Sequence, residues 1–503
     1  MARDPQAALI ALNRFGLGAR GGAAGDLVNA ASDPRGFVKA DLRRPAAVRL
    51  ELPSLQPTPA LAEAAFAYQA EVKQEREVRK ADAASKSDAS GAEARLAPSA
   101  DMSDKMASMD RPTKDDAKAS MQASEAAQPA KPLNVIQKTF RAEALARLQR
   151  ALQADCGFGE RLVTFWSNHF CISAAKGPLG RMWAGSFERE AIRPHVFGRF
   201  SDMLLAVEQH PAMLFFLDNQ QSIGPNSRAG QNGKRGLNEN LAREIMELHT
   251  LGVGGGYTQE DVTSLARIIT GWTFAGRQGK LGPPGHFVFN ENAHQPGPQV
   301  LLGKSYGDTG VAQGEAALSD IAHHPSTAKF IATKLARHFV ADDPPPALTA
   351  RLQDVFRKTD GDLLALATAM VDSDEAWRPP PSKIRSPYEY LIATGRLLDH
   401  VPDEPNRYLG GLNMLGQPLW TPSGPNGFPD TNAAWAAPEG MKLRLDIAAQ
   451  VASRVGDNVD PRDLLELAAA GAASQATRQT IERAESRQQA MALLLMSPEF
   501  QRR

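Results

Sequence analysis

Cysteine is scarce in this sequence: Cys156 and Cys171 are the only two among 503 residues. So few thiols argue against a disulfide-rich scaffold and against a thiolate metal site. The two cysteines flank one predicted helix, which as a straight helix would hold their Cα atoms about 22 Å apart. A disulfide between them therefore requires that helix to begin late or to end early, because a disulfide tolerates only a short separation.

An excess of charge of either sign is also missing, since 57 Lys and Arg balance 57 Asp and Glu. Nothing global therefore favours nucleic acid or an anionic membrane as a partner. No run approaches 18 consecutive apolar residues, so we expect no transmembrane helix. The N-terminal segment 1–20 lacks the apolar core and the small-residue cleavage site of a secretory signal, which favours a cytoplasmic protein.

Several well-known catalytic and cofactor-binding motifs are missing as well. The sequence has no Walker lysine after a glycine loop, no GxGxxG after a strand, no HExxH and no GxSxG. These motifs hold nucleotide phosphates, dinucleotides, zinc and a nucleophilic serine, respectively. No cofactor is therefore predicted.

Apolar residues recur at helical spacing along most of the chain, for example at Ile136, Phe140 and Leu148. This periodicity predicts a mainly α-helical fold in which many helices surround a single core. We expect residues 1–68 to form an N-terminal helical segment of that core and residues 132–503 to form the main helical domain.

The segment 69–131 has a different composition, rich in alanine, serine, lysine and aspartate and poor in large apolar residues. It cannot bury enough surface to offset the entropy of ordering, so we predict a partly helical, then disordered insertion. The alternative is a charge-rich interaction arm.

The only β signal lies in two short apolar runs, Phe287–Phe289 and Val300–Leu302, on either side of a turn-rich segment. Strands of this length that flank turn residues are typical of a hairpin. We therefore predict one small hairpin in an otherwise helical protein.

The stretch 237–274 holds the strongest local pattern, two helices joined by a glycine-rich turn. The first predicted helix, 238–251, has apolar residues at the spacing of a half-buried stripe. We expect Gly252 to end it, because glycine adopts the left-handed conformation without a Cβ penalty. Thr258 and Asp261 have the spacing of a capping box for the second helix.

The polar face of the helix 238–251 is the candidate site. It consists of Glu239, Asn240, Arg243, Glu244 and Glu247. The three acids are the catalytic candidates, and the other two residues are candidates for binding substrate. Three carboxylates around one guanidinium cannot neutralise one another, so a buried cluster must shift its pKa values, bind a cation or hold a cationic or polyhydroxyl ligand. The alternative is a solvated face with i,i+4 pairs worth roughly 0.3–0.5 kcal/mol each.

Four further residues are candidates for binding substrate: His169, Asp218, Trp420 and Trp435. His169 lies among aromatic residues, where a hydrogen-bonded core histidine is the commoner role. Asp218 precedes the polar loop 220–236, which is typical either of a lid or of a plain surface loop. The two tryptophans lie in an irregular segment rich in glycine and proline, where they either stack on a flat sugar face or pin the segment to the core.

Several strings along the chain resemble one known family. They are LNRFGLGAR near the start, FWSNHF at 165–170, HPAMLFFLDN at 210–219, the acidic helix with its glycine turn, GQPLWTPSGPNGFPD at 416–430 and SPEFQRR at the end. Together they resemble the bacterial family catalogued as domain of unknown function 1800, apart from an insertion at about 65–132. The family has no established activity, so the resemblance implies a relationship and no chemistry. Many members resemble exported proteins, which implies a periplasmic location.

The first functional hypothesis is a hydrolase that acts on a carbohydrate or a related polar polymer. Paired carboxylates can divide the general acid and base roles when their surroundings separate their pKa values. Glu244 and Glu247 are the predicted pair, with Arg243 orienting the substrate and Trp420 or Trp435 stacking on it. A variant uses these acids with either His169 or His249, and with Asp218, to bind a divalent cation. The spacing matches no standard metal motif, so no metal site is assigned.

The second hypothesis is a non-catalytic accessory protein. Members of the resembled family are often similar to neighbours of a sulfatase-like protein, which implies a scaffold, chaperone or export partner. In that case the acidic helix only pairs charges. An open pocket around the three acids would favour the enzyme, and an exposed or fully paired set would favour the accessory protein.

Overall fold

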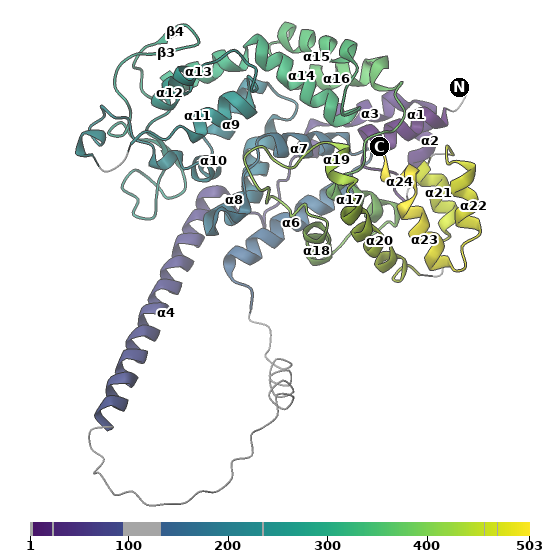
Figure 1. Ribbon diagram of the computed structural model, residues 1–503, viewed down its shortest axis with the longest axis horizontal. Coiled ribbons are helices and arrows are strands. Elements are labelled where there is room, and N and C mark those ends of the chain that lie inside the picture. Colours follow the sequence, from purple (N-terminus) through teal and green to yellow (C-terminus); the bar gives the residue numbers. More distant parts are fainter. Residues whose placement is uncertain (1–3, 23–24, 94–131, 234–235, 457, 470) are drawn as a thin grey trace, which may run out of the picture. The chain divides into compact units, whose positions relative to one another are not determined.

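The computed structural model describes residues 4–22, 25–93, 132–233, 236–456, 458–469 and 471–503. The chain divides into two compact units, one formed by Met1–Glu63 with Thr139–Arg503 and the other by Ala64–Lys138. Nearly all regular structure is helical, which confirms the mainly α-helical class (Figure 1). Among the described residues, no helix is both long and apolar enough to cross a membrane.

The helices before residue 94 are α1 (Pro5–Leu9), the π-helix η1 (Ile10–Phe15), α2 (Gly25–Ser32), α3 (Pro34–Leu42), the 3-10 helix η2 (Pro45–Val48) and α4 (Thr58–Glu93). The next group comprises α6 (Val135–Gln153), α7 (Phe158–His169), η3 (Ala174–Lys176), α8 (Pro178–Phe187), η4 (Glu188–Ile192), η5 (Arg193–His195), α9 (Phe200–Glu208), α10 (Pro211–Phe216), η6 (Asn219–Gln221), η7 (Gly230–Asn232), α11 (Asn240–Glu244), η8 (Ile245–His249) and α12 (Gln259–Ile268).

After the strands come α13 (Val311–Ala322), α14 (Pro325–Phe339), α15 (Pro346–Lys358), α16 (Leu363–Asp372), η9 (Asp374–Ala376), α17 (Pro387–Leu397), α18 (Asn406–Met414), α19 (Asn432–Trp435), α20 (Pro438–Ala452), α21 (Pro461–Ala469), α22 (Gln475–Glu482), α23 (Arg487–Met496) and α24 (Pro498–Gln501). Many of these helices begin at a proline that follows a capping side chain, as at Asp4 and Pro5, where the carboxylate accepts from the amide of Ala7. This is the start expected of a capped helix with proline in its first turn.

The two predicted strands form, but they do not pair with each other. The strand β2 (Phe287–Phe289) pairs antiparallel with β1 (Trp272–Phe274), and β3 (Gln299–Leu301) pairs with β4 (Lys304–Tyr306). The prediction of one hairpin is therefore wrong in its pairing. Trp272 of β1 is fully buried, so β1 is held in the core. Each predicted strand pairs with a strand that the sequence pattern did not predict, β2 with β1 and β3 with β4.

The expected insertion at 69–131 is helical in its described part, because α4 continues from Thr58 to Glu93. This agrees with the expectation of a partly helical start. The predicted disorder concerns residues 94–131, which lie outside the described residues.

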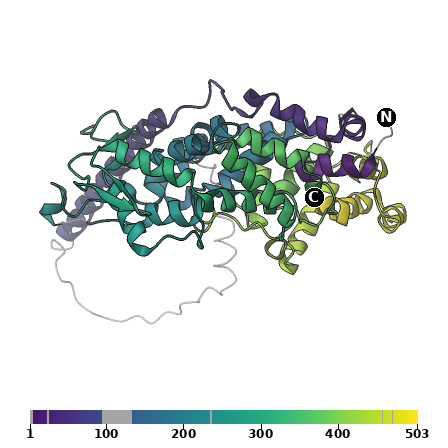
Figure 2. The same ribbon diagram turned by 90° about the horizontal axis from the view of Figure 1, so that it is seen from above.

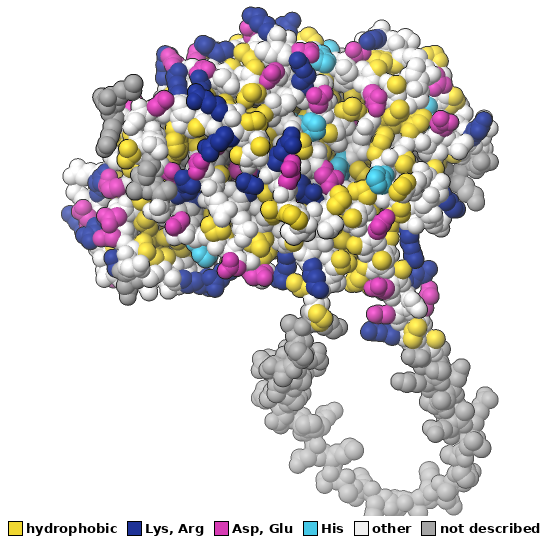
Figure 3. Space-filling view, turned by 180° about the vertical axis from the view of Figure 1, so that it is seen from behind, with side chains coloured by type: hydrophobic (Ala, Val, Ile, Leu, Met, Phe, Trp, Pro, Cys, Tyr) yellow, Lys and Arg dark blue, Asp and Glu magenta, His cyan; other side chains and the backbone are white. Residues whose placement is uncertain are grey.

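In the larger unit, the first and last helices of the chain lie side by side, as both views show (Figures 1 and 2). The side-chain amide of Asn13 donates to the carbonyl of Ala468 at 3.2 Å, and Arg385 donates to Asn13 at 2.8 Å. Basic and acidic side chains are interspersed over the face shown in Figure 3, in keeping with the balanced composition.

Candidate functional site

The acidic helix forms, but it changes type halfway. The helix α11 ends at Glu244 and continues without a break as the π-helix η8 from Ile245 to His249. A π-helix places more residues in each turn, so the register of its side chains shifts, and such segments are frequent at functional sites. The shift buries His249, which the helical pattern did not place in the core, and leaves Leu248 only partly buried.

The turn after this helix agrees with the sequence. Gly252 has a φ of 80°, as predicted for a residue that ends a helix in the left-handed conformation. A Cβ at this position would lie 2.7 Å from the ring of Phe330 in α14. Thr258 and Asp261 form the predicted capping box at the start of α12.

The outer end of the acidic face is paired. Glu239 accepts from Arg243 at 3.1 Å, from Gln259 at 2.9 Å and from the hydroxyl of Thr263 at 2.8 Å. The hydrogen bond from Thr263 is the main reason why the pKa of Glu239 is lowered. Asn240 is exposed on the same surface. These contacts join α11 to α12, so Glu239 occupies a structural position.

Glu244 differs from Glu239 in its surroundings. It is half-buried and has no hydrogen bond to any described residue. Burial raises the pKa of Glu244, and the neighbouring charge of Glu247 adds to this, while His249 and Arg243 oppose it. A carboxyl group with a raised pKa keeps its proton at a pH at which ordinary carboxyl groups have lost theirs.

Tyr257 lies close to the same two acids. Burial, followed by the charges of Glu247 and Glu244, raises the pKa of its phenol. The pair predicted from the sequence is therefore brought together, with a half-buried phenol beside it.

A half-buried lysine, Lys334 of α14, contacts His169 near this region. Its ammonium group donates to Nδ1 of His169 at 2.9 Å, and Nε2 of His169 donates to the carbonyl of His249 at 3.0 Å. Burial lowers the pKa of Lys334 to about 8. Burial, with the nearby charge of Lys334, also lowers the pKa of His169 well below its usual value, so this histidine is neutral.

The thiol of Cys171 is close enough to both Lys334 and Glu244 for their charges to affect its pKa. Burial raises its pKa to about 12; the charge of Lys334 opposes this increase and the charge of Glu244 adds to it. Glu244 and Lys334 therefore both act on one buried sulfur atom. The raised pKa of Glu244 and the lowered pKa of Lys334 each favour the neutral form of that side chain. Shifts of this kind are typical of groups that transfer protons.

His249, the last residue of the π-helix, forms a buried dyad with Glu208 of α9. Nδ1 of His249 is 2.8 Å from Oε1 of Glu208, and both side chains are almost inaccessible to solvent. Nε2 of His249 and Oε2 of Glu208 have no hydrogen-bond partner in the part of the chain that the structure describes. The dyad orients His249, whose carbonyl in turn orients His169.

The family-like strings FWSNHF and GPNGFPD meet at this site. The side-chain amide of Asn168 donates to the carbonyl of Phe428 at 2.9 Å and accepts from its amide at 2.8 Å. The thiol of Cys171 donates to the carbonyls of Gly424 and Pro425. A Cβ on Gly427, whose φ is 76°, would lie 2.4 Å from the carbonyl of Asn168. The segment 421–430 thus covers the end of α7.

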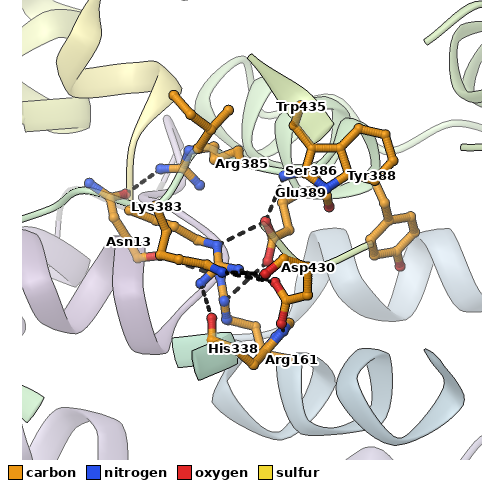
Figure 4. Close-up of polar contacts among 12 residues, drawn as sticks. Asn13, Arg161, His338, Lys383, Arg385, Ser386, Tyr388, Glu389, Asp430 and Trp435 are labelled. Carbon is orange, nitrogen blue, oxygen red and sulfur yellow. Dashed lines mark hydrogen bonds and ion pairs between the residues drawn. The ribbon is translucent and has the colours of Figure 1, made fainter. Parts of the chain in front are cut away.

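The far end of this segment is held by a buried ionic cluster (Figure 4). Asp430 accepts from Nδ1 of His338 at 2.9 Å and pairs with Lys383 at 3.2 Å. Burial works against the charge on Asp430, but His338, Lys383 and Arg503 hold its pKa well below the usual value. Asp430 is also close enough to Lys334 to favour the charged ammonium form. The cluster therefore anchors the segment 421–430 and adjoins the candidate site.

One of the remaining candidates, Trp420, lines the same small cavity as Asn168, Cys171 and Phe428. Asp218 pairs with Lys176 at 2.6 Å at the end of α10. The indole of Trp420 donates to the buried Glu188 and packs edge-on against Phe140, beside a cavity of about 60 Å³. A cavity of this size holds a few water molecules and no sugar ring.

The other tryptophan, Trp435, donates to the carbonyl of Pro429 at 2.9 Å. Each indole donates to another acceptor and neither forms a hydrogen bond with Glu244 or Glu247, so their substrate roles stay predictions. Among the described residues, no three His, Cys, Asp or Glu side chains gather in a way that could hold a metal ion.

Sequence reasoning missed Lys334, Cys171 and Tyr257 as members of the site. Lys334 lies in an ordinary amphipathic helix, and no local signal distinguishes it from the exposed Lys329 on the same helix. Asp430 could have been found, because it ends a family-like string.

A model of the family described as protein of unknown function (DUF1800) matches residues 10–502, which is nearly the whole chain. The chain belongs to this family. No curated protein and no solved structure matched it. Membership in the DUF1800 family therefore assigns no activity to this chain.

Proposed function

We propose that this member of the DUF1800 family is a hydrolase that acts on a carbohydrate or a related polar polymer. Glu244, the last residue of α11, is the proposed general acid. Glu247, three residues further along and within the π-helix, is the second carboxyl group. The observation that carries the proposal is the state of Glu244, which is half-buried, has no hydrogen-bond donor among the described residues and has a raised pKa. Hydrolysis of a glycosidic bond requires such a group to protonate the leaving oxygen.

The surroundings of Glu244 support this role. Glu239 differs because three donors stabilise its charged form, so it cannot serve as a proton donor at neutral pH. Arg243 lies at the outer end of the same face, where it can orient a polyhydroxyl chain through its free N–H groups. Lys334 has a pKa lowered to about 8, so it holds its proton less firmly than an ordinary lysine.

The activity test uses the purified full chain and a panel of soluble polysaccharides: xylan, laminarin, chitosan and carboxymethylcellulose. Released reducing ends are measured for the wild type and for Glu244→Gln and Glu247→Gln. Both variants are expected to lose at least about 100-fold in rate, within the range for a positioned acid or base. Glu260→Gln is the matched control, since Glu260 is exposed in the first turn of α12. Wild-type rates in Glu244→Gln would refute the proposal.

A second measurement separates a functional carboxyl group from a structural one. If Glu244 is held in the site at a cost in stability, Glu244→Gln should leave the free energy of unfolding unchanged or raise it. If its charge is needed to hold the fold together, the same change should lower stability by several kcal/mol. Urea unfolding at pH 7, with Glu260→Gln beside it, distinguishes these results.

An accessory role without catalysis is the second candidate. It is favoured by the pairing of Glu239 with Arg243, Gln259 and Thr263, which accounts for the outer part of the acidic face as a joint between two helices. Under this proposal a sulfatase-like companion is the expected partner, and Glu244→Gln should change neither catalysis nor stability by more than about 0.5 kcal/mol.

A further inference from the structure

A second cavity lies in a part of the molecule that the acidic site does not use. Its volume is about 470 Å³, and it is formed by α17, α18, the end of α20 and the residues that follow α20 (Figure 1). Its apolar wall includes Leu391, Leu398, Met414, Ile447, Val451 and Val455. The volume falls within the range of pockets that hold small molecules. The cavity is open to solvent at Gly410 and Met414, so part of this apolar wall is exposed, and exposed apolar surface of this kind marks binding sites.

Glycine in α18 provides the first indication of an occupant. Gly410 and Gly411 lie within this helix, where glycine lowers stability relative to alanine. A Cβ on Gly411 would lie 3.0 Å from Leu391, so close packing explains that glycine. A Cβ on Gly410 would meet no atom within 4 Å, and yet Gly410 lines the cavity. Packing within the protein therefore gives no reason for glycine at position 410, whereas space for a ligand does.

Charge at the opening gives the second indication. Arg407 and Arg454 both line the cavity and are exposed. Neither guanidinium group has a hydrogen bond or an ion pair with any described residue. His400 and Gln450 are further polar residues at the exposed rim. Two guanidinium groups that have no partner among the described residues, beside an aliphatic wall, are complementary to a molecule with one anionic group and one apolar chain.

We propose that this cavity binds an amphiphilic anion, in which a single aliphatic chain occupies the apolar interior and the anionic group lies between Arg407 and Arg454. The chain is aliphatic because the wall consists mainly of leucine, isoleucine, valine and methionine side chains. The anionic group is a carboxylate or a phosphate, since guanidinium groups bind both through paired hydrogen bonds.

Isothermal titration calorimetry on the full chain with decanoate, monodecyl phosphate, 1-decanol and acetate tests the proposal. Decanoate or decyl phosphate should bind with a stoichiometry near one, and the tighter of the two identifies the anionic group. Acetate, which lacks the chain, and 1-decanol, which lacks the charge, should each bind at least about tenfold more weakly. This expectation follows from loss of the apolar contact in one case and of the charged contact in the other.

Two variants test the two halves of the site. Gly410→Leu should weaken binding of the preferred anion by at least about tenfold because leucine extends into the cavity. The melting temperature should stay the same or rise, because a Cβ at this position meets no atom within 4 Å and glycine lowers the stability of a helix. The double change Arg407→Gln with Arg454→Gln should weaken binding of the anion by a similar factor and leave the binding of 1-decanol unchanged. Arg483→Gln, at an exposed arginine outside the cavity, is the control and should bind like the wild type.

The proposal is overturned if neither anion shows saturable binding up to millimolar concentration. It is also overturned if the binding that is seen is the same in Gly410→Leu and in the double arginine variant as in the wild type. A loss that also appears in Arg483→Gln would show a general effect of surface charge and would likewise refute it.

Discussion

The side-chain amide of Asn168 satisfies both of its polar atoms on the backbone of Phe428, at 2.9 and 2.8 Å. This two-way contact resembles the pairing of neighbouring strands, although Asn168 ends a helix and Phe428 lies in an irregular segment. It joins the last turn of α7 to the segment 421–430 and thereby covers the thiol of Cys171. The contact explains how a segment rich in glycine and proline keeps one conformation beside the candidate site.

Removing this contact should loosen the segment. Asn168→Ala leaves the amide and the carbonyl of Phe428 without partners, so the free energy of unfolding should fall by roughly 2 kcal/mol. Chemical denaturation of the wild type and the variant measures the loss. Asn413→Ala, at an exposed asparagine in α18, is the control and should stay within about 0.5 kcal/mol. Equal stability of the two variants would contradict the anchoring role of Asn168.

Two glycines near the acidic helix allow the stability cost of backbone strain to be distinguished from the cost of a steric clash. Gly252 and Gly256 have similar φ values, 80° and 87°. A Cβ at 252 would lie 2.7 Å from Phe330, whereas one at 256 would meet nothing within 4 Å. Gly256→Ala should therefore cost roughly 1 kcal/mol for its backbone conformation alone, and Gly252→Ala should cost clearly more. Thermal melts of both variants check this, and an equal loss would show that the ring of Phe330 moves aside freely.

The half-buried lysine should make stability depend on alkaline pH. The folded-state pKa of Lys334 is about 8, below its ordinary value of 10.5, so the unfolded chain binds more protons between these two values. Stability should therefore rise with pH through this window, and the cost of the buried charge should be fully present below pH 8. That cost is on the order of 3 kcal/mol at most.

The lysine prediction is tested by Lys334→Met. This variant should be more stable than the wild type at pH 7, and the difference should shrink as the pH approaches 10.5. Lys329→Met, at an exposed lysine on the same helix, should show no such dependence. A parallel pH profile for the wild type and Lys334→Met would show that the ammonium group is well solvated.

The two thiols should be free and unreactive in the folded protein. Cys156 and Cys171 are both buried and unpaired, and burial raises the pKa of each. Because the thiolate is the reactive form, a thiol reagent at pH 8 should label neither residue before unfolding and both after it. Labelling is followed by mass spectrometry. Faster labelling of Cys171 in Asn168→Ala would link the cover over this thiol to the contact with Phe428, and labelling of Cys156 serves as the internal control.

Local patterns in the sequence determined the helical class of this protein and several of its helix ends. The helical class, the helix starts at Asp4 and Thr258, and the left-handed Gly252 depend on neighbouring residues, so their patterns are visible in the chain. Glu244 and Glu247 could be predicted to lie near each other for the same reason, because they are three residues apart in one predicted helix.

Only the tertiary structure decided what surrounds those acids. The π-helix from Ile245 to His249 shifts the register in a way that an even helical period does not show. Lys334 comes from another helix, and Cys171 is covered by a segment more than 250 residues further along the chain. The strand pairing was decided in the same way, since each strand selects its partner by proximity in the fold. Burial and long-range contact, which raise the pKa of Glu244 and lower that of Lys334, arise when distant segments meet, and no local pattern encodes them.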